Sequence, residues 1–70
     1  MIYREAARKL KALGCVEISR TGSGAHRKWM NPATNQSTVV PDHPGKDIKF
    51  GTLKAVVRQL SLKWSDFDAA

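Results

Sequence analysis

Residues 15–41 read CVEISRTGSGAHRKWMNPATNQSTVVP, and this stretch decides the fold. Its first segment, residues 15–20, alternates the apolar Val16 and Ile18 with polar neighbours. Successive side chains of a strand point to opposite faces, so this alternation predicts a half-buried strand. A glycine-rich loop follows and separates this strand from the rest of the stretch.

Two further strands are predicted after the loop, over residues 26–31 and 36–40. The turn between them, residues 31–35, contains Pro32 and two asparagines, which favour turn geometry. Pro41 stops the third strand because proline cannot donate to a sheet ladder. Short strands at hairpin spacing predict an antiparallel sheet.

Amphipathic helices are predicted on both sides of the strands. Over residues 2–13 the apolar side chains fall on one stripe of a 3.6-residue period, and Gly14 ends this helix as a C-terminal cap. Residues 41–49 predict an ordered loop, and a second amphipathic helix follows from Thr52. Ser61 resembles the N-cap of a short terminal helix.

The resulting order, α-β-β-β-α, predicts a single small α+β domain over residues 1–70. Two helices are expected to cover one face of a three-stranded antiparallel sheet, with a short C-terminal helix beside them. A chain of this size buries only about 60% of its unfolded surface. We therefore expect a surface site and no deep catalytic cleft.

The composition favours an anionic partner. Twelve Lys and Arg residues against six acids give a formal charge of +6 and a pI near 10.0, which suits nucleic acid better than a membrane. No apolar stretch approaches the roughly 20 residues of a spanning helix, and the N-terminus lacks a secretory signal, so a cytoplasmic protein is expected. We expect the single cysteine, Cys15, to act as a half-buried small apolar residue and not as a nucleophile.

The candidate site lies in residues 22–29, where a glycine-rich loop runs into a histidine, two cations and a tryptophan. No acid occurs between Glu17 and Asp42. This spacing leaves three cations without a partner nearby in the sequence, namely Arg20, Arg27 and Lys28. We interpret the segment as one that meets an anion, with backbone amides of the loop near Gly24 able to approach it closely.

His26 and Trp29 are three positions apart on a predicted strand, so they point to opposite faces of the sheet. Trp29 is expected to pack in the core, which places His26 on the solvent side with Lys28. From the residues alone, His26 fits an exposed polar strand residue better than a catalytic one. His43 is the other histidine, and its interpretations are a structural loop residue or a second acid/base.

Four basic helix residues are typical of solvated helix faces, although their distribution also suits a phosphate track: Arg4, Arg8, Lys54 and Arg58. The spacing of Glu5 and Lys9 is typical of an i,i+4 pair on a helix surface. Trp64 and Phe67 are expected to pack on the chain's own helices, with an anchor for a protein partner as the alternative. The residues give no ligand set for a metal site and no nucleotide-binding fingerprint.

Three separated motifs in register are similar to those of a known family. Residues 26–32 read HRKWMNP, residues 39–46 read VVPDHPGK, and residues 49–53 read KFGTL. In order and spacing they resemble the HicA family of mRNA interferase toxins, whose signature is a Gly-Ser-His-x-x-aromatic motif followed by a Val-Pro-x-His segment and a Gly-Thr-Leu helix start. Ala25 stands where that signature usually has serine.

The resemblance implies a double-stranded-RNA-binding-domain-like fold and a ribonuclease that acts on single-stranded mRNA with His26 as its catalytic residue. RNA carries its own nucleophile, the 2'-hydroxyl, so cleavage requires proton transfer and charge stabilisation but no metal and no cofactor. Phosphate contacts are then expected from the loop and its flanking cations: Arg20, Gly24, Arg27 and Lys28. The resemblance also implies a HicB-type antitoxin. A non-catalytic RNA-binding module with the same fold is the alternative function.

Overall fold

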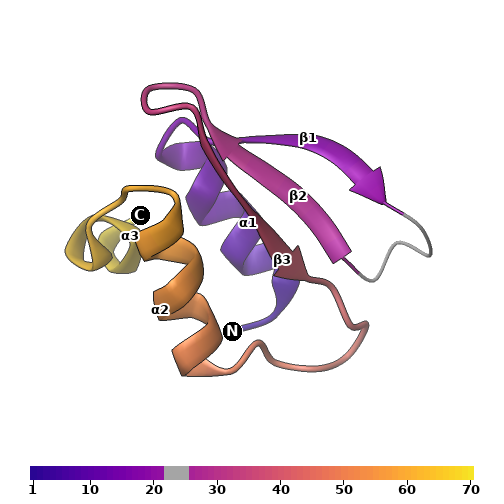
Figure 1. Ribbon diagram of the computed structural model, residues 1–70. Helices are drawn as coiled ribbons and strands as arrows, with labels where there is room; N and C mark the ends of the chain where they lie inside the picture. The colour runs from indigo at the N-terminus through magenta and orange to yellow at the C-terminus, as the bar shows by residue number, and fades with distance from the viewer. Residues whose placement is uncertain (22–25) are drawn as a thin grey trace.

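A computed structural model describes residues 1–21 and 26–70, with the backbone alone for residues 19–21. The order is α-β-β-β-α with a short final helix, as the sequence predicts (Figure 1). The elements are α1 (Tyr3–Ala12), β1 (Val16–Thr21), β2 (His26–Asn31), β3 (Gln36–Pro41), α2 (Phe50–Gln59) and α3 (Trp64–Ala69). None of the helices among the described residues is long and apolar enough to cross a membrane.

The strands form one antiparallel sheet in the order β1-β2-β3. Trp29 pairs with Thr38 of β3, and both side chains are buried on the helix side. His26 and Lys28 alternate with them and are exposed on the open face. The register of β1 against β2 shifts between Glu17 and Ser19, a local irregularity that the sequence pattern does not reveal.

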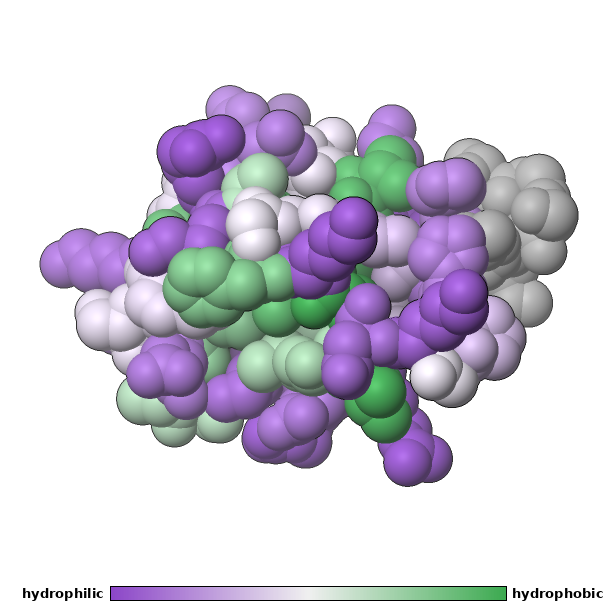
Figure 2. Space-filling model, turned by 90° about the horizontal axis from the view of Figure 1, so that it is seen from below, coloured by the Kyte–Doolittle hydropathy of each residue, from purple (hydrophilic) through white to green (hydrophobic). Residues whose placement is uncertain are grey.

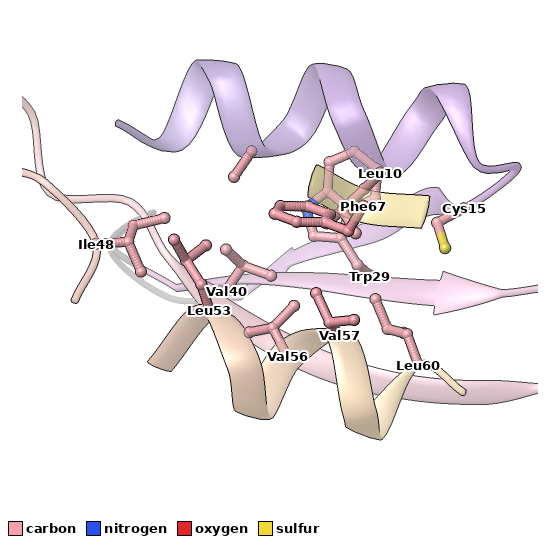
Figure 3. Packing of buried hydrophobic residues seen from close by; sticks show 11 residues of the cluster. Leu10, Cys15, Trp29, Val40, Ile48, Leu53, Val56, Val57, Leu60 and Phe67 are labelled. Carbon is pink, nitrogen blue, oxygen red and sulfur yellow. The ribbon is translucent and has the colours of Figure 1, made fainter. Parts of the chain in front are cut away.

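The core fills the space between α1, α2 and the sheet (Figure 3). Its largest fully buried side chains are Trp29, Phe67, Leu10, Leu60, Val40 and Val57. The prediction that Trp29 packs in the core is confirmed. Cys15 is 2% exposed, so it lies deeper than the half-buried position expected for it. Phe67 is a core residue and is not available as an anchor for a protein partner.

Lys9 attaches α3 to α1, which differs from the surface i,i+4 pair that its spacing indicates. Its side chain is buried, and Nζ donates to three carbonyl oxygens at the end of α3: Phe67 (3.2 Å), Asp68 (2.9 Å) and Ala70 (3.1 Å). The last carbonyls of a helix lack partners within the helix and carry a partial negative charge. The Lys9 ammonium group gives these carbonyls hydrogen-bond donors and also opposes their partial negative charge.

Both long helices end in the same way. Gly14 has a left-handed φ of 90°, its N–H donates to Lys11 O (3.0 Å), and the next N–H, of Cys15, donates to Leu10 O (2.9 Å). These two bonds define a Schellman motif, which confirms the predicted cap.

Ser61 occupies the equivalent position after α2, with a φ of 58°. Its N–H donates to Arg58 O (3.0 Å), and that of Leu62 donates to Val57 O (3.0 Å). The prediction that Ser61 is the N-cap of the last helix is therefore wrong, because this residue completes the end of α2. Lys63 is the N-cap of α3 instead. The start of α2 also differs from the prediction, since the helix begins at Phe50, two residues before Thr52.

Candidate functional site

The two histidines lie side by side at one end of the sheet. His26 is the first residue of β2 and pairs with Pro41, the last residue of β3. The chain leaves the sheet at Pro41, so His43 is still close to His26. The ring centroids are 6.2 Å apart in an edge-to-face arrangement, with an interplanar angle of 80°. Both imidazoles are exposed, as predicted for His26.

A groove extends from His43 between one face of α1, the helix side of the sheet and the loop after β3. Residues that line it are Ile2, Tyr3, Arg4, Glu5, Ala7, Arg8, Lys11, Glu17, Arg27, Trp29, Asp42, His43, Pro44 and Gly45. The cations on α1 therefore belong to the same surface as one of the two imidazoles. This arrangement suits an extended polyanion, whose phosphates would follow the cations.

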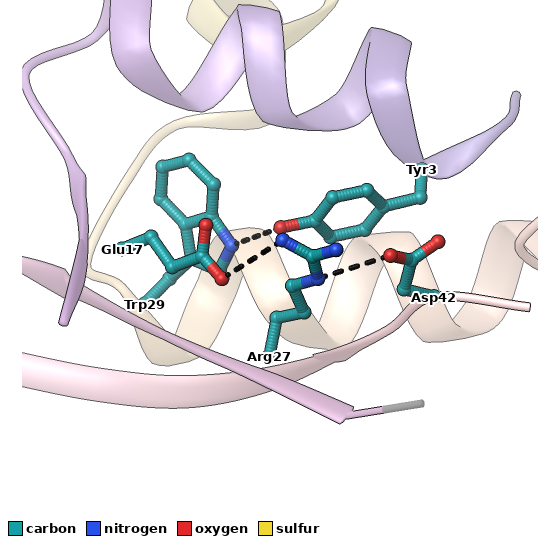
Figure 4. Close-up of polar contacts among 5 residues, drawn as sticks. All are labelled: Tyr3, Glu17, Arg27, Trp29 and Asp42. Carbon is teal, nitrogen blue, oxygen red and sulfur yellow. Dashed lines mark hydrogen bonds and ion pairs between the residues drawn. The ribbon is translucent and has the colours of Figure 1, made fainter. Parts of the chain in front are cut away.

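Arg27 lies on the helix side of the sheet, between two carboxylates (Figure 4). Its Nη1 donates to Glu17 Oε2 (3.3 Å), and its Nε lies 3.0 Å from Asp42 Oδ2. Desolvation lowers the pKa of Arg27, but the hydrogen bond from Arg27 to Glu17 and the negative charges nearby outweigh it and raise this pKa. Arg27 has no acidic neighbour in the sequence, but two hairpins bring Glu17 and Asp42 back to it, so it is not left without a partner for an anionic ligand.

Two aromatic residues, Tyr3 and Trp29, lie beside the ion pairs of Arg27. Trp29 Nε1 donates to Tyr3 Oη (2.9 Å), and the Arg27 guanidinium lies over the Tyr3 ring, with Cζ 5.1 Å from its centroid (Figure 4). Burial raises the pKa of Tyr3 despite the opposing hydrogen bond from Trp29. The sequence predicts Tyr3 only as part of the apolar stripe of a helix, and nothing in its spacing indicates this contact.

Lys28 lies on the face of the sheet opposite to Arg27, where it is exposed like His26. Arg20 pairs with Arg27 in the register of β1 and β2, but its side chain lies outside the described residues. Gly24 lies outside them altogether. The structure therefore places Lys28 on the face of His26 and Arg27 on the other face, which separates two cations that the sequence interpretation grouped together.

Cys15 does not belong to the site. Burial raises the pKa of its thiol, which disfavours the nucleophilic thiolate, in agreement with the prediction that it is not a nucleophile. Within residues 1–21 and 26–70 there is also no group of three or more His, Cys, Asp or Glu residues placed to hold a metal ion.

Comparison with known proteins identifies the family of this chain. The family model described as the HicA toxin of bacterial toxin-antitoxin systems matches residues 3–62. The chain belongs to the HicA family. Within the family, the chain is 46% identical over 63 residues to a protein of Pseudomonas fluorescens (strain Pf0-1) named "Probable mRNA interferase HicA". That alignment covers 90% of this chain and 98% of the relative.

The HicA match covers most of the molecule but not its last helix. It begins at the first residue of α1 and ends just before α3, so it includes both histidines, the Arg27 ion pairs and all the groove residues except Ile2. The resemblance inferred from the three motifs is thereby confirmed. The helix that Lys9 holds in place lies beyond the matched residues.

Proposed function

We propose that this chain is the toxin of a toxin-antitoxin pair and acts as an endoribonuclease on single-stranded mRNA. The observation that carries the proposal is the pair of exposed imidazoles, 6.2 Å apart between ring centroids, next to a groove lined with cations. The name of the Pseudomonas fluorescens relative, a probable mRNA interferase, supports the same reaction.

The proposed reaction uses the substrate's own nucleophile. His26 acts as general base and takes the proton from a ribose 2'-hydroxyl, whose oxygen then attacks the adjacent phosphorus. The bond from phosphorus to the 5'-oxygen breaks, and His43 acts as general acid and gives that oxygen a proton. The products are a 2',3'-cyclic phosphate and a 5'-hydroxyl, and water can later open the cyclic phosphate to a 3'-phosphate.

The spacing of the imidazoles suits this division of roles. The attacking and leaving oxygens lie on opposite sides of the phosphorus, and each must come within a hydrogen bond of about 2.6–3.2 Å of its acid or base. Two rings with centroids 6.2 Å apart can contact both oxygens of one phosphate. The substrate supplies the nucleophile, so the proposed reaction needs no metal and no cofactor.

Different cations take different parts in the proposed site. Lys28 is exposed on the face of His26 and is proposed to oppose the charge that the phosphate gains in the transition state. Arg20 and Gly24 remain proposed phosphate contacts. Arg27 is already held by Glu17 and Asp42, so we assign it to positioning the end of β2 and the loop that carries His43.

The proposed partner in the cell is a HicB-type antitoxin that covers the histidines, and the proposed location is the cytoplasm, where mRNA is translated. The support for an antitoxin is membership of a toxin-antitoxin family and the charge of +6, which favours an acidic inhibitor.

The test is incubation of the purified protein with a long single-stranded RNA in EDTA, followed by analysis of the new ends. We expect cleavage with cyclic or 3'-phosphate ends, no cleavage of the matching DNA, and loss of cleavage in His26→Ala with the fold retained. A strict requirement for Mg²⁺ would contradict the mechanism. Tight RNA binding without turnover would instead support the non-catalytic binding module.

A second measurement separates the two histidines. A nucleoside 3'-(4-nitrophenyl phosphate) has a leaving group that needs no general acid. His43→Ala should therefore lose most of its activity on RNA, by about 10²- to 10⁴-fold, but retain it on this substrate. His26→Ala should lose both activities. Equal loss of both activities in the His43 variant would show that His43 is not the acid.

A further inference from the structure

Two aromatic side chains meet on the surface where α2 and α3 begin. Phe50, the first residue of α2, is 63% exposed, and Trp64, the first residue of α3, is half-buried. Their ring centroids are 5.2 Å apart at an interplanar angle of 76°. Trp64 also contacts the buried Phe67, whose ring centroid is 5.4 Å from that of Trp64. The pair thus presents an aromatic surface on which Phe50 is the more exposed ring.

Cations surround this aromatic surface. Lys54 lies one turn after Phe50 on α2, and its Nζ is 4.9 Å from the centroid of Trp64 and 5.6 Å from that of Phe50. Lys49 and Lys63, the N-cap residues of α2 and α3, are both exposed. Lys54 has no carboxylate partner among the ion pairs of the described residues. A cation over aromatic rings, with further cations beside them, matches how proteins hold unpaired nucleotides.

A hollow runs from His43 toward the start of α2. One end of its lining is His43 and the other is Lys49, the residue that precedes Phe50 in the chain. The full lining is Pro41, His43, Lys46, Asp47, Ile48, Lys49 and Thr52. The loop before α2 and the start of α2 lie lowest in Figure 1. Figure 2 views the molecule from that side and shows hydrophobic side chains grouped among hydrophilic ones.

We infer that Phe50, Trp64 and Lys54 form a binding subsite for one unpaired nucleotide of the RNA, next to the phosphate that is cleaved. The base stacks on Phe50, and Lys54 moves from the rings to the nucleotide's phosphate. The inference rests on the proposed function, because it takes the cleaved RNA as the ligand. An RNA chain with its reactive phosphate at His43 would continue past Lys46 and Lys49 to this surface.

The test measures stacking directly and without turnover. Single-stranded RNA oligonucleotides carry 2-aminopurine at successive positions, and the protein carries His26→Ala so that the RNA stays intact. We expect binding to quench the fluorescence at one position. In this background Phe50→Ala should abolish the quenching and weaken binding about tenfold, whereas Phe50→Tyr should retain both. Val16→Ala truncates another exposed apolar residue, on β1, and is the matched control.

The outcomes separate this inference from the proposed function. If the wild-type protein cleaves RNA but Phe50→Ala, shown to be folded by circular dichroism, keeps full quenching and affinity, the subsite is overturned and the ribonuclease remains. If the wild-type protein does not cleave but the quenching depends on Phe50, the subsite stands without the reaction. Loss of antitoxin binding with unchanged RNA binding in Phe50→Ala would assign the surface to a protein and overturn the inference.

Discussion

At the residue scale, neighbouring side chains on β2 have opposite surroundings. Arg27 points to the helix side, where Glu17 and Asp42 hold it against the ring of Tyr3. Lys28 points to the open face and is exposed. The alternation of a strand therefore separates two adjacent positive charges into a structural cation and one that remains available to a ligand.

This difference predicts different effects of removing each charge. Arg27→Gln leaves two partly buried carboxylates facing each other without a cation, so we expect a lower urea midpoint of unfolding. Lys28→Gln should leave that midpoint unchanged and reduce the slope of log K for RNA binding against log salt by about 1. The slope with and without Lys28→Gln can be measured in the His26→Ala background, in which the RNA stays intact. An unchanged midpoint in the Arg27 variant would show that the ion pairs contribute nothing to stability.

At the element scale, α3 depends on a contact with a distant helix. A helix of six residues is too short to be stable alone, and the Lys9 ammonium group holds its last carbonyls. Lys9→Met keeps the aliphatic length but leaves those carbonyls unpaired, so the free energy of unfolding should fall by about 1–3 kcal/mol. The amides of α3 should also exchange faster with deuterium. Lys11→Met, at an exposed position on the same helix, is the control and should change neither quantity.

The two Schellman motifs give a second prediction at this scale. An L-residue in the left-handed conformation costs roughly 1–2 kcal/mol, and Ser61 adopts it where glycine is usual. Ser61→Gly should therefore stabilise the protein by about 1 kcal/mol in chemical denaturation. Gly14→Ala should have the opposite effect, since a Cβ there meets nothing within 4 Å and the cost is conformational. No gain from Ser61→Gly would indicate that glycine's greater freedom in the unfolded chain cancels it.

At the scale of the whole molecule, the net charge of +6 bears on how the surface site could be silenced. Both histidines are exposed in the structure. A HicB-type antitoxin should therefore cover them with an acidic surface, and its association should slow as salt rises. Hydrogen exchange of the complex should show new protection at residues 26–29. If that strand exchanges equally fast in the free and bound protein, inhibition by occlusion is wrong.

Local patterns of the sequence determined the elements of this protein and the faces of its central strand. The 3.6-residue stripe, the alternation of β1 and the turn residues predicted α1, the strands and their order because helix and strand periods follow from backbone geometry alone. For the same reason the sequence placed Trp29 inside and His26 outside. The three motifs predicted the family that the comparison with known proteins confirmed.

Only the tertiary structure decided which distant residues meet. It brought His43 to His26, Glu17 and Asp42 to Arg27, and Lys9 to the end of α3. It also made Ser61 the end of α2 and not the start of α3. These contacts depend on hairpin register and on how the helices pack over the sheet. Such packing is set by the whole core at once, so the spacing of residues along the chain does not reveal it.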